Sequence, residues 1–192
     1  MAAIEQAKTA ILALKGSDRY RTMVEIAAIL TELLEPNGVK PVIVGGLAVE
    51  IYTRSQYTTM DVDLIVSRRD LAKHILEQLG FVQEGRHWYH PEVDASIEIP
   101  GEQLAGASED KITRITLSSG RHVYVIGLED LILDRLSACV YWKSYLDCEW
   151  AQRMVKLHYD ILDLEYLLGQ AGKEPGELLA TLNTWLSAVG EI

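Results

Sequence analysis

The stretch from Val42 to Val66 constrains the fold more than any other part of the chain. It opens with the apolar run VIV at 42–44, passes through Gly45-Gly46, and closes with the apolar run LIV at 64–66 directly after two aspartates. Short apolar runs rich in β-branched residues and bounded by glycine are typical of strands in a mostly buried sheet. The stretch therefore predicts a strand, a glycine turn, the first turns of a helix, and a second strand.

Gly45 and Gly46 stand where the first of these strands ends. Because glycine has no Cβ atom, the pair permits a tight strand-to-helix turn and lets a ligand approach the backbone amides closely. The free amides and the dipole at the start of the following helix favour an anion. The turn therefore predicts a phosphate-binding site.

Asp61 and Asp63 begin the second strand, two residues apart. The period-two alternation of a strand directs both side chains to one face of the sheet. At a separation of about 5 Å and an effective dielectric constant of about 20, the two charges repel by roughly 3 kcal/mol, a cost that a divalent cation between them removes. Mg²⁺ prefers carboxylate oxygens and typically binds one or two of them together with substrate phosphates. The pair beside the glycine turn thus indicates phosphoryl or nucleotidyl transfer.

Gly45-Gly46, a helix, and then TMDVDL at 59–64 resemble the signature of the nucleotidyltransferase superfamily related to DNA polymerase β. The pattern is most similar to the small prokaryotic members, the minimal and AbiEii-like toxin group, over residues 40–66 and more weakly to about residue 168. The resemblance implies a transferase that moves a nucleoside monophosphate from a triphosphate such as ATP to a hydroxyl acceptor with Mg²⁺ (or Mn²⁺). It assigns nucleotide binding to Gly45, Gly46 and Thr59, and metal binding and catalysis to Asp61 and Asp63.

Two departures from the family pattern support an alternative function. Residues 47–60 form a longer spacer between Gly46 and Asp61 than is usual, and glycine stands at position 46 where many relatives have serine. The alternative is a catalytically inactive module that keeps the fold and binds a nucleotide or a protein partner. A metal-dependent phosphoesterase using the same carboxylates is a third possibility, which needs no acceptor.

A third carboxylate is expected on a neighbouring strand if two metal ions assist transfer. The segment VDASIEI at 93–99 supplies two candidates, and strand alternation puts Asp94 and Glu98 on one face. Asp94 directly follows Pro91-Glu92, where aspartate suits a turn. Glu98 lies between two isoleucines, where an unpaired carboxylate is costly unless it has a ligand. Glu98 is the preferred catalytic and metal-binding residue, with Asp94 as the alternative and a solvent-facing role open for either.

Arg135 lies on the helix that Glu129-Asp130 opens. In the family resemblance, a basic residue at this place faces the nucleotide, and relatives tend to have lysine there. Asp134 precedes it directly, so a purely structural ion pair between the two side chains remains equally open. Arg135 is therefore a candidate nucleotide-binding residue.

The remaining patterns predict an α/β (α+β) fold, with a mixed β-sheet core flanked by helices. An N-terminal helical pair at 1–35, with a cap at Ser17-Asp18, precedes an α/β core at 36–127, and a C-terminal helical region at 128–192 follows. The other expected strands are 81–82, 86–89, 93–99, 114–117 and 122–126, and the other expected helices are 67–79 with a cap at Ser67, 128–142, one capped by Ser144, 160–168 and 175–189.

The charge and hydropathy of the chain exclude some partners. A net charge of −10 argues against an extensive nucleic-acid surface, which needs many lysines and arginines. The apolar runs are too short to span a bilayer and the N-terminus lacks a signal-peptide pattern, so no membrane contact and a cytoplasmic location are expected. The expected partners are a nucleoside triphosphate, a protein, RNA or small-molecule acceptor, and an antitoxin-like protein or a second copy of the chain.

Three residue types outside these motifs receive structural interpretations. Cys139 and Cys148 lie nine residues apart without a CxxC pattern, which predicts two buried reduced thiols. His87 and His90 are three apart on a strand and point to opposite faces, which predicts surface or interface histidines and no metal pair. Packing rather than base stacking is expected for three tryptophans, namely Trp142, Trp150 and Trp185.

Overall fold

The computed structural model describes residues 2–173 and 176–190 and contains a seven-stranded mixed sheet in the order β3-β4-β5-β2-β1-β7-β6. β1 is antiparallel to β2 and parallel to β7, while β2 is parallel to β5. The predicted mixed sheet is therefore confirmed. The strands are β1 (Val42–Val44), β2 (Asp61–Ile65), β3 (Val82–Glu84), β4 (His87–His90), β5 (Ala95–Gly101), β6 (Thr113–Thr116) and β7 (His122–Val125).

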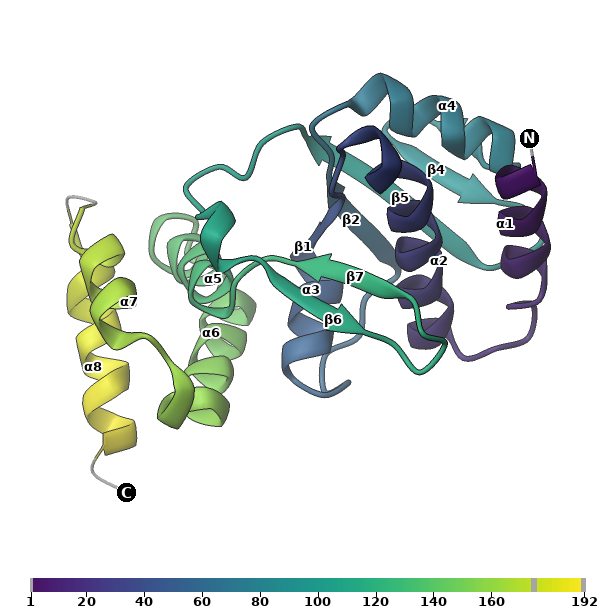
Figure 1. The fold of residues 1–192 in the computed structure, drawn as a ribbon. Helices are drawn as coiled ribbons and strands as arrows, with labels where there is room; N and C mark the ends of the chain where they lie inside the picture. The colour runs from purple at the N-terminus through teal and green to yellow at the C-terminus, as the bar shows by residue number, and fades with distance from the viewer. Residues whose placement is uncertain (1, 174–175, 191–192) are drawn as a thin grey trace.

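Helices precede the sheet, interrupt it and follow it. Figure 1 shows α1, α2 and α4 gathered around the sheet at the right of the view, with α5 to α8 in a group beside the sheet at the left, toward the C-terminus. The helices are α1 (Ala2–Leu12), α2 (Arg19–Leu34), α3 (Gly45–Tyr52), α4 (Arg69–Leu79), α5 (Leu128–Tyr141), α6 (Tyr145–His158), α7 (Leu164–Ala171) and α8 (Leu178–Gly190). Across the described residues, no helix has the length and apolarity needed to cross a bilayer.

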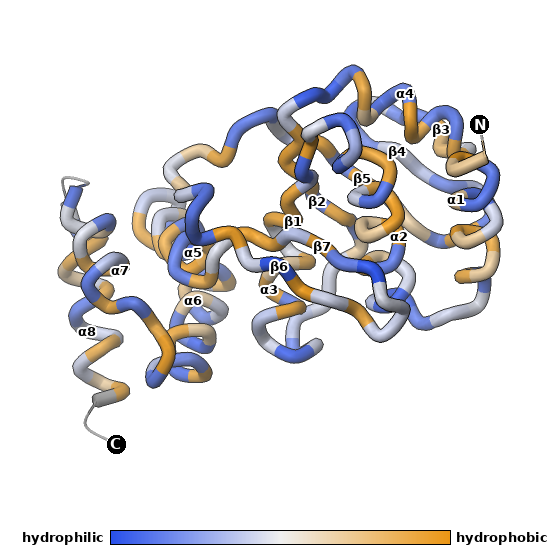
Figure 2. Tube along the Cα trace, in the orientation of Figure 1, coloured by the Kyte–Doolittle hydropathy of each residue, from blue (hydrophilic) through white to orange (hydrophobic). Residues whose placement is uncertain are grey.

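The central strands divide their side chains between two faces. Val62 and Leu64 of β2 and Ile97 of β5 are at most 1% exposed. They join the core under α2, which packs against β2, β5 and β7. Fully burying one such side chain stabilises the fold by about 1.5–3 kcal/mol. Figure 2 shows hydrophobic residues along these strands, whereas α4 alternates between hydrophobic and hydrophilic turns as expected for a helix on the outside.

Two of the three predicted helix caps are present. Asp18 accepts a hydrogen bond from the Arg21 amide at 2.9 Å, and Ser144 accepts one from the Asp147 amide at 3.4 Å. The cap predicted at Ser67 is wrong, since no side chain caps α4 at its N-cap residue. The carboxylate of Glu102 accepts a hydrogen bond from the first amide of that helix, at Arg69, at 3.1 Å. Glu102, which is distant in the sequence, thus accepts from the N-terminus of α4 in place of the expected Ser67.

The C-terminal helices begin later than the sequence predicts. The chain forms a short 3-10 turn at Tyr159–Ile161, and α7 starts only after Asp163, whose side chain accepts from the Tyr166 amide at 3.0 Å. The last helix starts at Leu178. The predicted start at Pro175 lies outside the described residues.

α5 and α6 form an antiparallel hairpin that is closed by a disulfide bond between Cys139 and Cys148, with a Cα–Cα distance of 4.7 Å. The prediction of two reduced thiols is wrong. The sequence predicts that the two cysteines lie on separate helices, but no local pattern specifies that these helices pack against each other. The turn at 142–144 instead reverses the chain and places the two residues opposite each other on packed helices.

The tryptophan and histidine predictions hold only in part. Trp150 is buried and Trp185 packs against the core, as expected, but Trp142 at the end of α5 is 83% exposed, so the packing predicted for it is wrong. His87 and His90 do point to opposite faces of β4. His90 is nevertheless 4% exposed and packs edge-on against the Phe81 ring, so it is a core residue and not a surface histidine.

Candidate active site

The glycine turn is packed tightly against the residues with which it was grouped from the sequence. Gly45 follows the last residue of β1 and starts α3 with a φ of +62°, a conformation that favours glycine. A Cβ atom at Gly45 would collide with the carboxylate of Asp63, and one at Gly46 would lie 2.7 Å from Oγ1 of Thr59. The contact with Thr59 gives a physical reason for glycine rather than serine at position 46. Both glycines, Thr59 and Asp63 thus form one close-packed unit.

Three carboxylates share the other face of β2 and β5. Asp63 stands opposite Glu98 in the parallel pairing of the two strands, and Asp61 stands opposite Ser96. Neighbouring strands lie about 4.8 Å apart, and residues paired in register project to the same side. Asp94 belongs to the exposed turn before β5 and not to the strand. Of the two candidates for a third carboxylate, the structure therefore brings Glu98, and not Asp94, beside Asp63.

The electrostatics of this face show an excess of negative charge. Burial raises the pKa of the Asp63 carboxyl above its usual range, and the charges of Glu98 and Asp61 raise it further. The backbone amide of Gly46 and the guanidinium of Arg135 act in the opposite direction and only partly offset this effect. A positive ion at this place would relieve the repulsion.

The donor set fits a hard divalent cation. Asp61, Asp63 and Glu98 offer only carboxylate oxygens, which are the ligands that Mg²⁺ and Mn²⁺ prefer in proteins. Among the described residues, no three acidic, histidine or cysteine side chains already converge on one point. Glu98 instead contacts Arg86, whose Nε lies 3.3 Å from the Glu98 Oε1. Asp61 and Asp63 would hold the ion, with Glu98 as the neighbouring third ligand.

Glu50 is a residue near the site that sequence reasoning missed. Its side chain is buried at 3% exposure, and burial raises its pKa. It accepts a hydrogen bond from the Thr59 amide at 3.3 Å, and Thr59 Oγ1 in turn accepts from the Asp61 amide at 3.4 Å. Glu50 thus fixes the end of the long spacer just before the carboxylates. The available signal was a single charge within the otherwise apolar helix GGLAVEIY.

Arg135 takes part in two ion pairs. Its Nη1 lies 2.9 Å from Oδ1 of Asp147, and its Nε lies 3.3 Å from Oδ2 of Asp134. The ion pair with Asp134 that the sequence left open is therefore present, and α6 adds a second partner. The pKa of Asp63 is raised overall by burial, and the positive charge of Arg135 is a smaller influence that acts to lower it.

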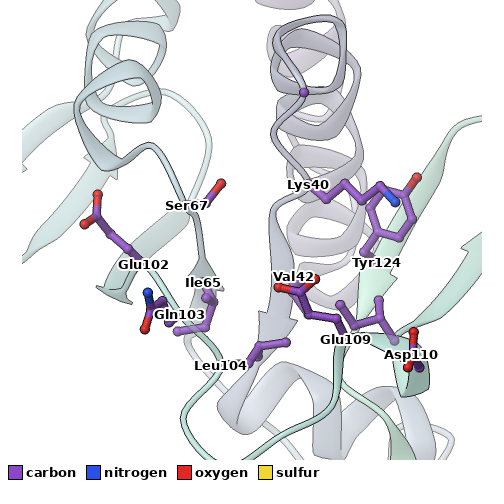
Figure 3. Close-up of a pocket in the computed structure, with 12 residues that line it drawn as sticks. Lys40, Val42, Ile65, Ser67, Glu102, Gln103, Leu104, Glu109, Asp110 and Tyr124 are labelled. Atoms are coloured by element: carbon purple, nitrogen blue, oxygen red, sulfur yellow. The ribbon is translucent and has the colours of Figure 1, made fainter.

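A cavity of about 620 Å³ lies at the opposite ends of β1 and β2 from the glycine turn, where Val42 pairs with Ile65 (Figure 3). None of the predicted site residues lines it. The candidate site is consequently an open face at the other end of these strands and does not coincide with this cavity. The polar and charged residues that line the cavity include Lys40, Ser67, Glu102, Gln103, Glu109 and Asp110.

Comparisons with known proteins give a consistent result. Residues 22–88 match a family model described as a nucleotidyl transferase of unknown function, DUF2204. Among curated proteins, none matches the chain. The matched segment contains the glycine turn, Thr59 and the Asp61–Asp63 pair, and ends before Glu98 and Arg135.

Two solved structures are similar to the chain over most of its length. One is an antigenic nucleotidyltransferase-like protein from Paracoccidioides brasiliensis, with 17% identity and a TM-score of 0.54, covering 84% of this chain and 92% of that one. The other is ANT(2'')-Ia in complex with adenylyl-2''-tobramycin, with 16% identity and a TM-score of 0.51, covering 81% and 94%. At these identities the similarity establishes the fold.

Proposed function

We propose that the chain, whose residues 22–88 match a nucleotidyl transferase family model, is a Mg²⁺-dependent enzyme that moves a nucleoside monophosphate from a triphosphate to a hydroxyl acceptor. One observation carries this proposal. Asp63 stands in register with Glu98 and packs against Gly45, so the expected metal ligands adjoin the expected phosphate-binding turn. The residues expected to bind the metal and the turn expected to bind the phosphates are therefore neighbours.

Each residue has a distinct role in the proposed reaction. The amides at Gly45 and Gly46 bind the phosphates at the start of α3, where the helix dipole favours anions. Asp61 and Asp63 hold the cation, and bound Mg²⁺ would neutralise the charge that develops on the phosphates during transfer. Arg135 supplies a further positive charge toward the same phosphates. Positioning and charge neutralisation account for most of the rate in such reactions.

The bond changes define the role of Glu98. The acceptor oxygen forms a bond to the α-phosphorus, the bond from that phosphorus to the bridging oxygen breaks, and pyrophosphate leaves. The acceptor hydroxyl must release a proton, and Glu98 either takes that proton or completes the metal site. Thr59 keeps Asp61 in place through the contact of its hydroxyl with the Asp61 amide.

Finer features belong to the same proposal. The nucleotide is a triphosphate such as ATP, and the acceptor is a hydroxyl of a protein, an RNA or a small molecule. A toxin-antitoxin role, an antitoxin-like partner or a homodimer, and a cytoplasmic location complete it. The disulfide bond between Cys139 and Cys148 argues against the cytoplasmic part of this proposal, because such bonds persist mainly in oxidising compartments.

One observation favours the alternative of an inactive binding module. Glu98 is held by Arg86, and the three carboxylates do not converge on one point in the part of the chain that the structure describes. An inactive module would bind a nucleotide or protein without releasing pyrophosphate.

The test is to incubate the protein with each of the four nucleoside triphosphates and Mg²⁺ in the presence of protein, RNA and aminoglycoside acceptors. Labelled monophosphate should appear on one acceptor class together with pyrophosphate, and both should vanish in Asp61→Asn/Asp63→Asn. Release of nucleotide products without any labelled acceptor would support a phosphoesterase. Binding of a triphosphate without turnover would support the inactive module.

A further inference from the structure

The row of polar side chains formed by Asp63 on β2 and Glu98 on β5 continues onto β4 with His87. Asp63 pairs with Glu98, and Glu98 pairs in register with His87 on the adjoining antiparallel strand. The three side chains therefore project from one face of three neighbouring strands. Nδ1 of His87 lies 3.8 Å from Oε2 of Glu98. Glu98 thus lies between Asp63, a candidate metal ligand, and the imidazole of His87.

Arg86 reaches this row from the turn between β3 and β4. Its Nε lies 3.3 Å from Oε1 of Glu98 and also donates a hydrogen bond to Nε2 of His87 at 3.3 Å. The preceding Gly85 has a φ of +61°, which lets the turn place the arginine over the strand face. Arg86 is 73% exposed, whereas Glu98 is 14% exposed. The guanidinium therefore covers the carboxylate from the solvent side, and His87 fixes its orientation.

A guanidinium and a divalent cation make opposing demands on one carboxylate. The Glu98 carboxylate has lone pairs for both, but the guanidinium and the cation are both positively charged, so they repel each other and draw on the same negative charge. When Glu98 serves the ion held by Asp61 and Asp63, its contact with Arg86 is therefore weakened. The free energy of this ion pair, of which only the arginine is well exposed, then opposes metal binding.

We propose that Arg86 is a positioning residue that competes with the divalent cation for Glu98 and so weakens metal binding in the absence of substrate. This inference rests on the proposed function, because it requires the cation site at Asp61 and Asp63. If Arg86 competes in this way, Glu98 joins the metal site more readily once Arg86 has moved away. Arg86 thereby controls when the third carboxylate becomes available.

The experiment is a titration of the protein with Mn²⁺, in which the electron paramagnetic resonance signal reports free ion. Arg86→Gln should bind Mn²⁺ roughly two- to fivefold more tightly than the unaltered protein, the equivalent of one exposed ion pair. Arg86→Lys keeps the charge and should remain close to the unaltered protein. Lys8→Gln is the matched control, since it removes one positive charge from an exposed ion pair with Glu5 on α1 and should change nothing.

A double-variant cycle shows whether the effect passes through Glu98. In a Glu98→Gln background, Arg86→Gln should no longer tighten Mn²⁺ binding. Unchanged or weaker binding in Arg86→Gln, with binding that still depends on Asp61 and Asp63, overturns this inference and leaves the proposed function standing. Tightening that persists in the Glu98→Gln background also overturns it. Absence of Mn²⁺ binding, or binding that survives Asp61→Asn/Asp63→Asn, overturns both together.

Discussion

The two faces of β2 and β5 come from the same strands but carry opposite kinds of residue. Val62, Leu64 and Ile97 point into the core and are at most 1% exposed, whereas Asp63 and Glu98 point to the open face. The covered face removes apolar surface from water and stabilises the fold. On the open face, burial and then the like charges of Glu98 and Asp61 raise the pKa of Asp63, and the charged carboxylate works against stability. One alternating pattern thus separates the residues that maintain the fold from those proposed to carry the chemistry.

The largest effect is expected on the open face. Asp61→Asn/Asp63→Asn should lower the rate of nucleotide transfer by about a thousandfold, because a bound cation supplies several kcal/mol of charge neutralisation in the transition state. The cooperativity of unfolding should be retained. The rate is measured with α-labelled triphosphate and the fold by denaturant titration. A loss of rate that is fully explained by a loss of folded protein would contradict the proposed division between the two faces.

On the covered face, Leu64→Ala should lower the free energy of unfolding by about 2–5 kcal/mol, since it leaves a cavity in a fully buried site. The transfer rate per folded molecule should change little. Urea titration measures the stability, and the rate is corrected for the folded fraction. A large loss of rate in fully folded Leu64→Ala would mean that the two faces are not separate in function.

The third carboxylate gives a matched pair of variants. Glu98→Gln should lower the transfer rate by about a hundredfold, an effect typical for one lost charged group at a reacting site. Asp94→Asn should leave it unchanged, because Asp94 lies on the exposed turn before β5. Steady-state rates with saturating triphosphate make the comparison. The reverse order would return Asp94 to the site.

Gly46, in the first turn of α3 beside the open face, packs closely against Thr59. Gly46→Ala should destabilise the protein by about 1–3 kcal/mol, because the new Cβ atom would lie 2.7 Å from Oγ1 of Thr59. The φ of Gly46 is not positive, so overpacking is the cause and not backbone strain. Thermal unfolding measures the effect. A variant as stable as the unaltered protein would show that Thr59 moves aside freely.

The smallest expected effect depends on pH. The pKa of Asp63 is raised in the folded state, so Asp63 favours folding only when protonated, below its unfolded pKa, and that contribution is lost as the pH rises through the folded pKa. Asp63→Asn should therefore be more stable than the unaltered protein at pH 7, and the gain should shrink in acid. Urea titrations at pH 7 and pH 4 measure the difference. A variant less stable at pH 7 would contradict the sign.

The strand, glycine turn, helix and carboxylate strand were predictable because each depends on local pattern. Alternation alone put Asp61 with Asp63, and the structure keeps them on one face together with Glu98. Alternation also grouped Asp94 with Glu98, which is wrong because Asp94 lies on the turn before β5. The position of Asp18 as a helix cap was equally local. Features set by neighbouring residues in the chain could be derived before the fold was known.

Features that depend on distant pairing could not. The contact between Arg86 and Glu98 arises from the register of β4 on β5, which no motif in either strand specifies. The bond between Cys139 and Cys148 requires the reversal between α5 and α6. The burial of Glu50 follows from packing of the long spacer over α3, which a sequence shows only as one unexplained charge.

The most direct test of the account is calorimetric titration of each nucleoside triphosphate into the protein with Mg²⁺, repeated with Asp61→Asn/Asp63→Asn. At least one triphosphate should bind only when Mg²⁺ is present, and the double variant should lose this binding. Absence of binding for all four triphosphates, or equal binding in the double variant, would contradict the claim that the open face of β2 and β5 is a nucleotide site.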